Sequence, residues 1–191
     1  MITILFAGPA GAGKTSTLRI LRNMRYQNAS FFDEIATNLL SSRDEKFCKD
    51  KKKFQEAIAN LQLQQLSECQ NSGADVCLFD RGLPDFFVYD AENAEQMLSL
   101  EEAFAPYDYI FYFREFPLHL ISEGNGFRKE SSLSEIKELV ETTRAVYEKC
   151  PDKWKIFLIP IFSSPEKKAV YVADLINELL EEPVFSIPKK Q

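Results

Sequence analysis

The sequence predicts a doubly wound α/β domain, with a parallel sheet and helices on both faces. Short apolar runs typical of buried parallel strands alternate with helical patterns along the chain. The chain has 191 residues, 45% of them hydrophobic, which is enough for one well-buried core and too little for two ordinary domains with a linker. In such a fold, ligands bind at the carboxyl ends of the strands.

Five apolar segments are predicted to form the strands. The first, ITILFA, is a continuous apolar run of the kind found in the middle of a parallel sheet, buried on both faces. The strands are predicted at 2–7, 29–32 (ASFF), 74–80 (ADVCLFD), 107–113 (YDYIFYF) and 155–162 (KIFLIPIF).

Helical patterns lie between these runs. Residues 41–72 contain no Gly or Pro and carry apolar side chains at near-helical spacing, so one long helix or two abutting helices should end at Gly73. A further helix is predicted to begin at a capping box made by Ser132 and Glu135. The last should open with the Ser-Pro pair at 164–165 and stop at Pro183.

Residues 1–183 therefore form one predicted domain, and residues 184–191 a loose tail. The net charge of −6 argues against a protein that coats a polyanion such as nucleic acid, so any phosphate site should be local. The apolar amino-terminal run is too short for a signal peptide or a membrane span. We expect no membrane association.

The four cysteines show no metal-binding spacing. They contain no Cys-x-x-Cys pair, and the chain has a single histidine, so no zinc set is predicted. We interpret them as reduced, mostly buried thiols in a reducing compartment, which favours the cytoplasm. They are Cys48, Cys69, Cys77 and Cys150.

The segment GPAGAGKT, residues 8–15, follows the first predicted strand and precedes a predicted helix. It fits G-x-x-x-x-G-K-[ST] at every fixed position, the pattern of a loop that wraps its N–H groups round a phosphate. Lys14 would reach the β- and γ-phosphates, and Thr15 would hold Mg²⁺. The alternative is a glycine-rich turn that binds nothing, but the complete match in this context favours a nucleoside triphosphate site.

The strand at 74–80 ends in FDRGLPDFFVYD, and no N/T-K-x-D motif of a GTPase appears in the chain. Asp80 stands where a strand-end carboxylate can order Mg²⁺ or bind a substrate hydroxyl, and Arg81 can steady a phosphate. Asp85 either binds a sugar hydroxyl or interacts with the dipole of a helix. This pattern suits phosphoryl transfer between small molecules.

A basic loop, GNGFRKE, follows the strand at 107–113. It places Arg128 and Lys129 after two glycines, within a predicted lid at about 115–130. Such a loop can close over a triphosphate and exclude water, which a kinase needs to avoid hydrolysing ATP. The alternative is an ordinary glycine loop with solvated cations.

With these motifs in this order, residues 2–182 resemble the AAA-like, ribosylnicotinamide-kinase-like P-loop NTPase domains, relatives of nucleoside and nucleotide kinases. The resemblance implies a five-stranded parallel sheet. The family's Glu-x-Ala-Arg segment matches Glu34 and Ala36, but Thr37 stands where arginine is usual. The family's basic lid matches Arg128.

The resemblance and the residues together give a predicted site. A base must accept the proton of an attacking hydroxyl, and Asp33, Glu34 and Asp80 are the candidates. By resemblance we favour Glu34, and we place Asp80 on the metal side with Thr15. We expect ATP and Mg²⁺ as cofactors. The residues expected to take part in catalysis are Lys14, Glu34, Asp80, Arg81 and Arg128, and those expected to bind the acceptor are Asp33, Glu34, Arg81 and Asp85. The residues expected to bind the nucleotide are Gly8, Ala10, Gly11, Ala12, Gly13, Lys14, Thr15 and Ser16.

Two classes of function remain open from the sequence. The first is a kinase that transfers the γ-phosphoryl group of ATP to a nucleoside, a nucleotide or a similar small molecule. The second is an NTPase or a nucleotide-controlled interaction module without a metabolic acceptor. A variant of the first, a kinase acting on modified bases in DNA, is disfavoured by the acidic charge.

Overall fold

The computed structural model describes residues 1–26, 28–42, 47, 49–114, 133–181 and 185–186. Within them a five-stranded sheet has the order β3-β4-β1-β5-β6, and every neighbouring pair is parallel. The strands are β1 (Ile2–Ala7), β3 (Ala29–Phe32), β4 (Val76–Asp80), β5 (Tyr109–Phe113) and β6 (Ile156–Ile159). The predicted doubly wound parallel α/β fold is confirmed.

The last strand is shorter than the apolar run that predicts it. We predict a strand over 155–162, but β6 ends at Ile159 because Pro160 has no N–H to donate to a neighbouring strand. Ile161 beyond it is 71% exposed, so the end of the run lies outside the core.

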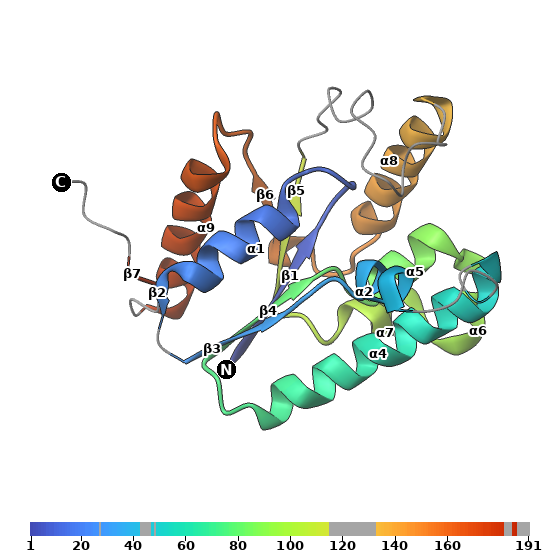
Figure 1. The fold of residues 1–191 in the computed structure, drawn as a ribbon, viewed down its shortest axis with the longest axis horizontal. Coiled ribbons are helices and arrows are strands. Elements are labelled where there is room, and N and C mark those ends of the chain that lie inside the picture. The colour runs from blue at the N-terminus through green and yellow to red at the C-terminus, as the bar shows by residue number, and fades with distance from the viewer. Residues whose placement is uncertain (27, 43–46, 48, 115–132, 182–184, 187–191) are drawn as a thin grey trace.

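Helices cover both faces of the sheet (Figure 1). On one face α1 (Lys14–Asn23) packs beside α9 (Pro165–Leu180), over Ile4 and Phe6 of β1. On the other face lie α4 (Lys51–Asn71), α5 (Pro84–Tyr89) and α8 (Leu133–Glu148). They are accompanied by α2 (Ile35–Ser42), α6 (Ala91–Met97) and α7 (Leu100–Phe104), and the 3-10 turn Lys153–Lys155 precedes β6.

Local capping explains where the predicted helices begin and end. The Asp50 side chain accepts a hydrogen bond from the Lys53 N–H and starts α4, which ends shortly before Gly73 at φ +66°. Ser164 caps α9 in the same way, but α9 ends at Leu180, before the predicted stop at Pro183. The predicted cap at Ser132 lies outside the described residues.

A second, two-stranded sheet includes residues close to the carboxyl terminus. We predict a loose tail over 184–191, yet β7 (Phe185–Ser186) pairs antiparallel with β2 (Arg25–Tyr26). A two-residue pairing uses backbone groups and leaves no side-chain pattern for the sequence to show.

The described cysteines are buried, as the sequence predicts. Cys69, Cys77 and Cys150 are free and buried, while Cys48 lies outside the described residues. Among the described helices, none combines the length and apolar character needed to cross a membrane.

Candidate active site

The loop after β1 has the backbone that a phosphate-binding loop requires. Gly8, Gly11 and Gly13 have φ values of +119°, +80° and +91°, a region that side-chain-bearing residues rarely adopt. A Cβ atom on Gly8 would also collide with the carbonyl oxygen of Phe113. The loop therefore depends on glycine, and it leads directly into α1 at Lys14, whose N-terminal N–H groups favour an anion.

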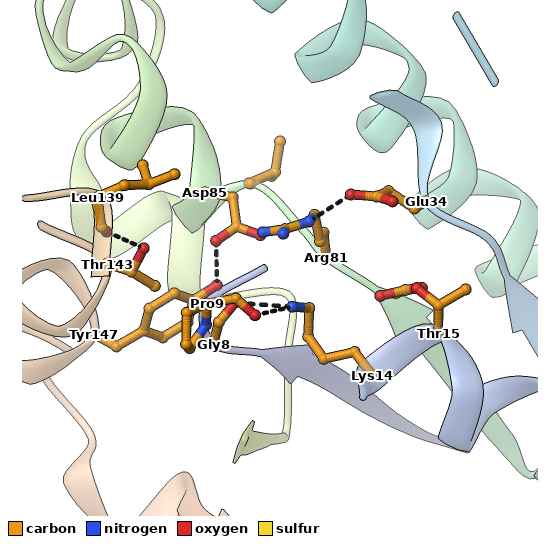
Figure 2. A network of polar contacts seen from close by, with 12 residues as sticks. Gly8, Pro9, Lys14, Thr15, Glu34, Arg81, Asp85, Leu139, Thr143 and Tyr147 are labelled. Carbon is orange, nitrogen blue, oxygen red and sulfur yellow. Dashed lines mark hydrogen bonds and ion pairs between the residues drawn. The ribbon is translucent and has the colours of Figure 1, made fainter. Parts of the chain in front are cut away.

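Lys14 lies folded back on its own loop (Figure 2). Its Nζ donates hydrogen bonds to the carbonyl oxygens of Gly8 at 2.9 Å and Pro9 at 2.8 Å, and the residue is 4% exposed. Burial and then the nearby Arg81 charge lower the pKa of Lys14 to about 7, although neighbouring carboxylates oppose them. The neighbouring carboxylates thus offset only part of the cost of burying the Lys14 ammonium within the loop.

Thr15 and Asp80 meet at the carboxyl end of the sheet. The Thr15 hydroxyl donates to Asp80 Oδ2 at 2.5 Å. The second oxygen, Oδ1, is buried and has no hydrogen-bond partner within the described part of the chain. Burial raises the pKa of Asp80, with Lys14 and the Thr15 hydroxyl opposing it.

These oxygens fit Mg²⁺. In nucleotide sites this ion uses one or two carboxylate or hydroxyl oxygens together with waters and phosphates. An orphaned carboxylate oxygen beside a threonine hydroxyl offers such ligands. Among the described residues no group of three or more His, Cys, Asp or Glu side chains forms a metal cage, which a nucleotide-borne Mg²⁺ does not need.

Arg81 is held between two carboxylates. It follows β4 with φ +75°, its Nε donates to Glu34 Oε1 at 2.6 Å, and its Nη1 donates to Asp85 Oδ2 at 3.3 Å. The Tyr147 hydroxyl of α8 donates to Asp85 Oδ1 at 3.1 Å, as Figure 2 shows. A non-glycine residue in the left-handed region indicates strain that the surrounding contacts maintain, as at many functional sites.

Glu34 is ionised within this group of charges. Burial alone would raise the pKa of Glu34, but Arg81 and the Thr37 hydroxyl, which donates to Oε2 at 2.8 Å, outweigh it and lower the pKa. Thr37 therefore orients the carboxylate of Glu34.

A pocket of about 260 Å³ opens beside Arg81. Side chains from α2, α4 and α5 form its walls, so segments far apart in the sequence build it. Its polar lining residues are Glu34, Gln55, Gln62, Arg81 and Asp85, and its aromatic ones are Phe54, Phe86 and Tyr89.

The structure separates Asp33 from this group. The Asp33 carboxylate pairs with the Arg22 guanidinium through two hydrogen bonds, of 2.9 and 3.1 Å, and its side chain is 51% exposed. Ser16 is exposed on the first turn of α1, and Ala12 is buried in the loop. The predicted lid, including Arg128, lies outside the described residues.

One residue of α9 that the sequence does not single out contacts the glycine-rich loop at 8–15. Lys168 is 4% exposed, and its Nζ donates to the carbonyl oxygen of Ala12 at 3.0 Å. A Cβ atom on Gly13 would lie 3.0 Å from the same Nζ, a tight contact that adds to the preference for glycine already set by the φ of +91°. Because 156 positions separate it from Ala12, no local pattern could have found this contact.

The sequence model of one protein family, described as an AAA domain, matches residues 3–158. The chain belongs to this AAA domain family. No curated protein sequence matches it.

Solved structures show which fold this AAA domain shares. Thymidylate kinase from Candida albicans is 13% identical with a TM-score of 0.64, over 93% of this chain and 92% of that one. Deoxyadenosine kinase from M. mycoides, with dCMP and dCDP bound, is 18% identical with a TM-score of 0.66, over 93% and 100%. The NadR protein in complex with NR is 18% identical with a TM-score of 0.68, over 97% of this chain and 51% of NadR. The fold is that of P-loop nucleoside and nucleotide kinases.

Proposed function

We propose that this AAA domain is a kinase that transfers the γ-phosphoryl group of ATP to a hydroxyl or phosphate of a small molecule, with a nucleoside or nucleotide as acceptor. The observation that carries the proposal is the pocket lined by Arg81. Arg81 is the next residue in the chain after Asp80, whose carboxylate accepts a hydrogen bond from Thr15. A hydrolase needs room only for water, whereas a pocket of about 260 Å³ with aromatic walls suits a bound acceptor.

The phosphate-binding loop would hold the nucleotide. Backbone N–H groups of 8–15 and the start of α1 would surround the phosphates, and the Lys14 ammonium would leave the carbonyl oxygens of Gly8 and Pro9 for the β- and γ-phosphates. Thr15 and Asp80 would hold Mg²⁺, which supplies neutralisation of charge on the transferring group.

Glu34 is the proposed base. The acceptor hydroxyl oxygen attacks the γ-phosphorus, its proton passes to the Glu34 carboxylate, and the bond from γ-phosphorus to the bridging oxygen breaks, leaving ADP with the electron pair. Arg81 keeps this carboxylate ionised and in place. Asp85, fixed by Arg81 and Tyr147, is the proposed acceptor-binding carboxylate.

The cell compartment is part of the proposal. Three buried free thiols are compatible with a reducing cytoplasm, where ATP and small-molecule acceptors are available.

The affinity for ATP should fall as the pH rises above about 7. In the nucleotide-free chain the pKa of Lys14 is about 7, and a bound triphosphate would raise it because opposite charge favours the ammonium. Above this pH, ATP binding must take up a proton, so the affinity should weaken by up to about tenfold per pH unit. Calorimetric titration from pH 6 to pH 9 measures this. Lys14→Met should bind weakly with little pH dependence, and a wild-type affinity that stays constant over this range contradicts the proposed role.

A screen of nucleosides and nucleotides for acceptor-stimulated ADP release tests the kinase proposal. ATP consumption should be slow without acceptor and rise strongly with the right one. We further expect Arg128→Ala to reduce this acceleration by at least about 10²-fold, by analogy with other arginines that stabilise a transferring phosphoryl group. Arg128→Lys should rescue little, since a point charge cannot reproduce a two-pronged contact. Rapid ATP hydrolysis that no acceptor stimulates and that is indifferent to Arg128 would favour the hydrolase instead.

A further inference from the structure

One wall of the pocket beside Arg81 carries an amide oxygen that lacks a hydrogen-bond partner among the described residues. Gln62 of α4 lines the pocket and is 5% exposed. Its Oε1 is buried and has no hydrogen-bond partner among the residues that the structure describes. Leaving a buried amide oxygen unpaired is costly, and such groups recur where a ligand supplies the missing partner.

Gln62 differs in this respect from the glutamines that follow it closely on α4. Neither Gln64 nor Gln65 has a buried side-chain atom without a partner among the described residues. The Gln64 amide donates to Glu68 Oε1 at 2.8 Å, and the Gln65 amide donates to the backbone carbonyl oxygen of Asp33 at 3.1 Å. Gln62 differs from both because α4 turns it into the pocket instead of toward the surface. What would complete its hydrogen bonding is therefore something that enters the pocket and donates an N–H or O–H.

The neighbouring walls favour a flat group at this position. Phe54, Phe86 and Tyr89 line the same pocket, and aromatic side chains accept planar heterocycles on their faces or edges. A heterocyclic base that carries an amino group matches both the aromatic walls and the unpaired oxygen.

The charges of the pocket disfavour a phosphate on the acceptor. Among the described lining residues, the carboxylates of Glu34 and Asp85 face the single guanidinium of Arg81, which is bonded to both. The lining thus carries more negative than positive charge, and a phosphomonoester would add further negative charge at short range.

We propose that the pocket takes a nucleoside without a phosphate group, whose base donates an N–H from an amino group to Gln62 Oε1. The proposal rests on the kinase function above and narrows its acceptor from nucleosides and nucleotides to amino-bearing nucleosides. Gln62 is then a specificity-determining residue that contacts the base, at the far side of the acceptor from the reacting hydroxyl.

The test compares acceptors that differ by one amino group. Adenosine is paired with purine riboside, cytidine with pyrimidin-2-one riboside, and each with its 2′-deoxy form and its 5′-monophosphate. In the wild-type protein, loss of the amino group should lower kcat/KM by at least about tenfold in the preferred pair, because a site built to hydrogen-bond a group rejects the analogue that lacks it. The monophosphates should be poorer acceptors than the nucleosides.

Gln62→Leu should reduce this preference to about threefold or less, through a loss of kcat/KM with the amino-bearing nucleoside. Gln64→Leu, on the exposed side of α4, is the matched control and should keep the preference. Melting curves establish that both variants fold. If Gln62→Leu does not fold, Gln62→Glu takes its place. This variant retains an acceptor oxygen and should keep a preference for the amino-bearing nucleoside. Equal kcat/KM of Gln62→Glu for the amino-bearing and the amino-free nucleoside would overturn the proposal.

The inference and the kinase proposal fail in different ways. Phosphorylation of both members of each pair at similar rates, or better use of the monophosphates, overturns the inference and leaves the kinase intact. If no acceptor is phosphorylated, the kinase proposal fails, and calorimetric titration with the same nucleosides decides the inference. Binding of adenosine or cytidine that weakens at least about tenfold in the amino-free analogue and in Gln62→Leu supports it; equal or absent binding overturns it.

Discussion

Lys14→Ala should lower phosphoryl transfer by at least about 10²-fold, the loss typical of removing one preorganised group at a developing charge. The nucleotide-free domain should keep its fold. Within the described part of the chain, the hydrogen bonds of the Lys14 side chain go to Gly8 and Pro9 of its own loop, and burial of its ammonium is unfavourable, as its lowered pKa indicates. ATP with Mg²⁺ should therefore raise the melting temperature of the wild type much more than that of the variant.

Lys167→Ala provides a matched control for this experiment. Lys167 is exposed at the start of α9, and its Nζ contacts only Ser163 Oγ, at 3.1 Å, among the hydrogen bonds described for it. Its removal should leave both turnover and stabilisation by ATP near the wild-type values. If ATP stabilises Lys14→Ala as strongly as the wild type, the phosphate-binding role of 8–15 is wrong.

Asp80→Asn and Glu34→Gln should each lower turnover by at least about 10²-fold while ATP still binds. Each change keeps the shape of the side chain and removes its charge. The two should differ in detail. Asp80→Asn should need more Mg²⁺ for half-maximal rate, because it removes a proposed ligand beside Thr15. Glu34→Gln should leave the Mg²⁺ requirement unchanged and affect the acceptor step.

Asp33→Asn is the control that shows whether loss of any carboxylate from this segment lowers turnover, or only loss of the carboxylate of Glu34. Asp33 is adjacent to Glu34 in the chain, but its carboxylate is paired with Arg22 and half exposed. We expect near-wild-type turnover from this variant. A loss as large as that of Glu34→Gln would reverse the assignment of the base, and near-wild-type turnover by both Asp80→Asn and Glu34→Gln would refute the proposed catalytic residues.

The strand, the glycine-rich loop at 8–15 and the helix after it could be predicted because their determinants are local. Glycines, a lysine and a hydroxyl at fixed spacing after an apolar run specify a strand, a turn and a helix N-terminus without help from the rest of the chain. The closeness of Asp80, Arg81 and Asp85 could be predicted for a similar reason, since Asp80 ends β4, Arg81 follows it directly and Asp85 lies in the first turn of α5.

The different surroundings of Asp33 and Glu34 could not be predicted from the sequence. Successive residues of an extended segment point to opposite sides, so neighbours at a strand end can face different surroundings. Asp33 meets Arg22 of α1, whereas Glu34 meets Arg81 beyond β4. Arg22 lies 11 positions from Asp33 and Arg81 lies 47 positions from Glu34, and neither pairing follows a local spacing rule that would favour one carboxylate.

The pocket and the contacts that support it are tertiary features, made by residues far apart in the sequence. Tyr147 reaches Asp85 from α8, and Gln62 enters the pocket from a helix whose sequence pattern predicts only that it is helical. In both cases the chemistry depends on how one helix is rotated against another. A single sequence does not contain that information in any local motif.

The most direct test of the central claim follows the γ-phosphoryl group itself. The purified protein is incubated with ATP labelled at the γ-phosphorus, Mg²⁺ and the nucleoside that best stimulates ADP release, and the label is separated into phosphorylated nucleoside and inorganic phosphate. We expect nearly all of the label on the nucleoside, one per ADP formed, and little turnover when the nucleoside is left out. Label that appears as inorganic phosphate at the same rate with and without nucleoside would contradict the kinase assignment.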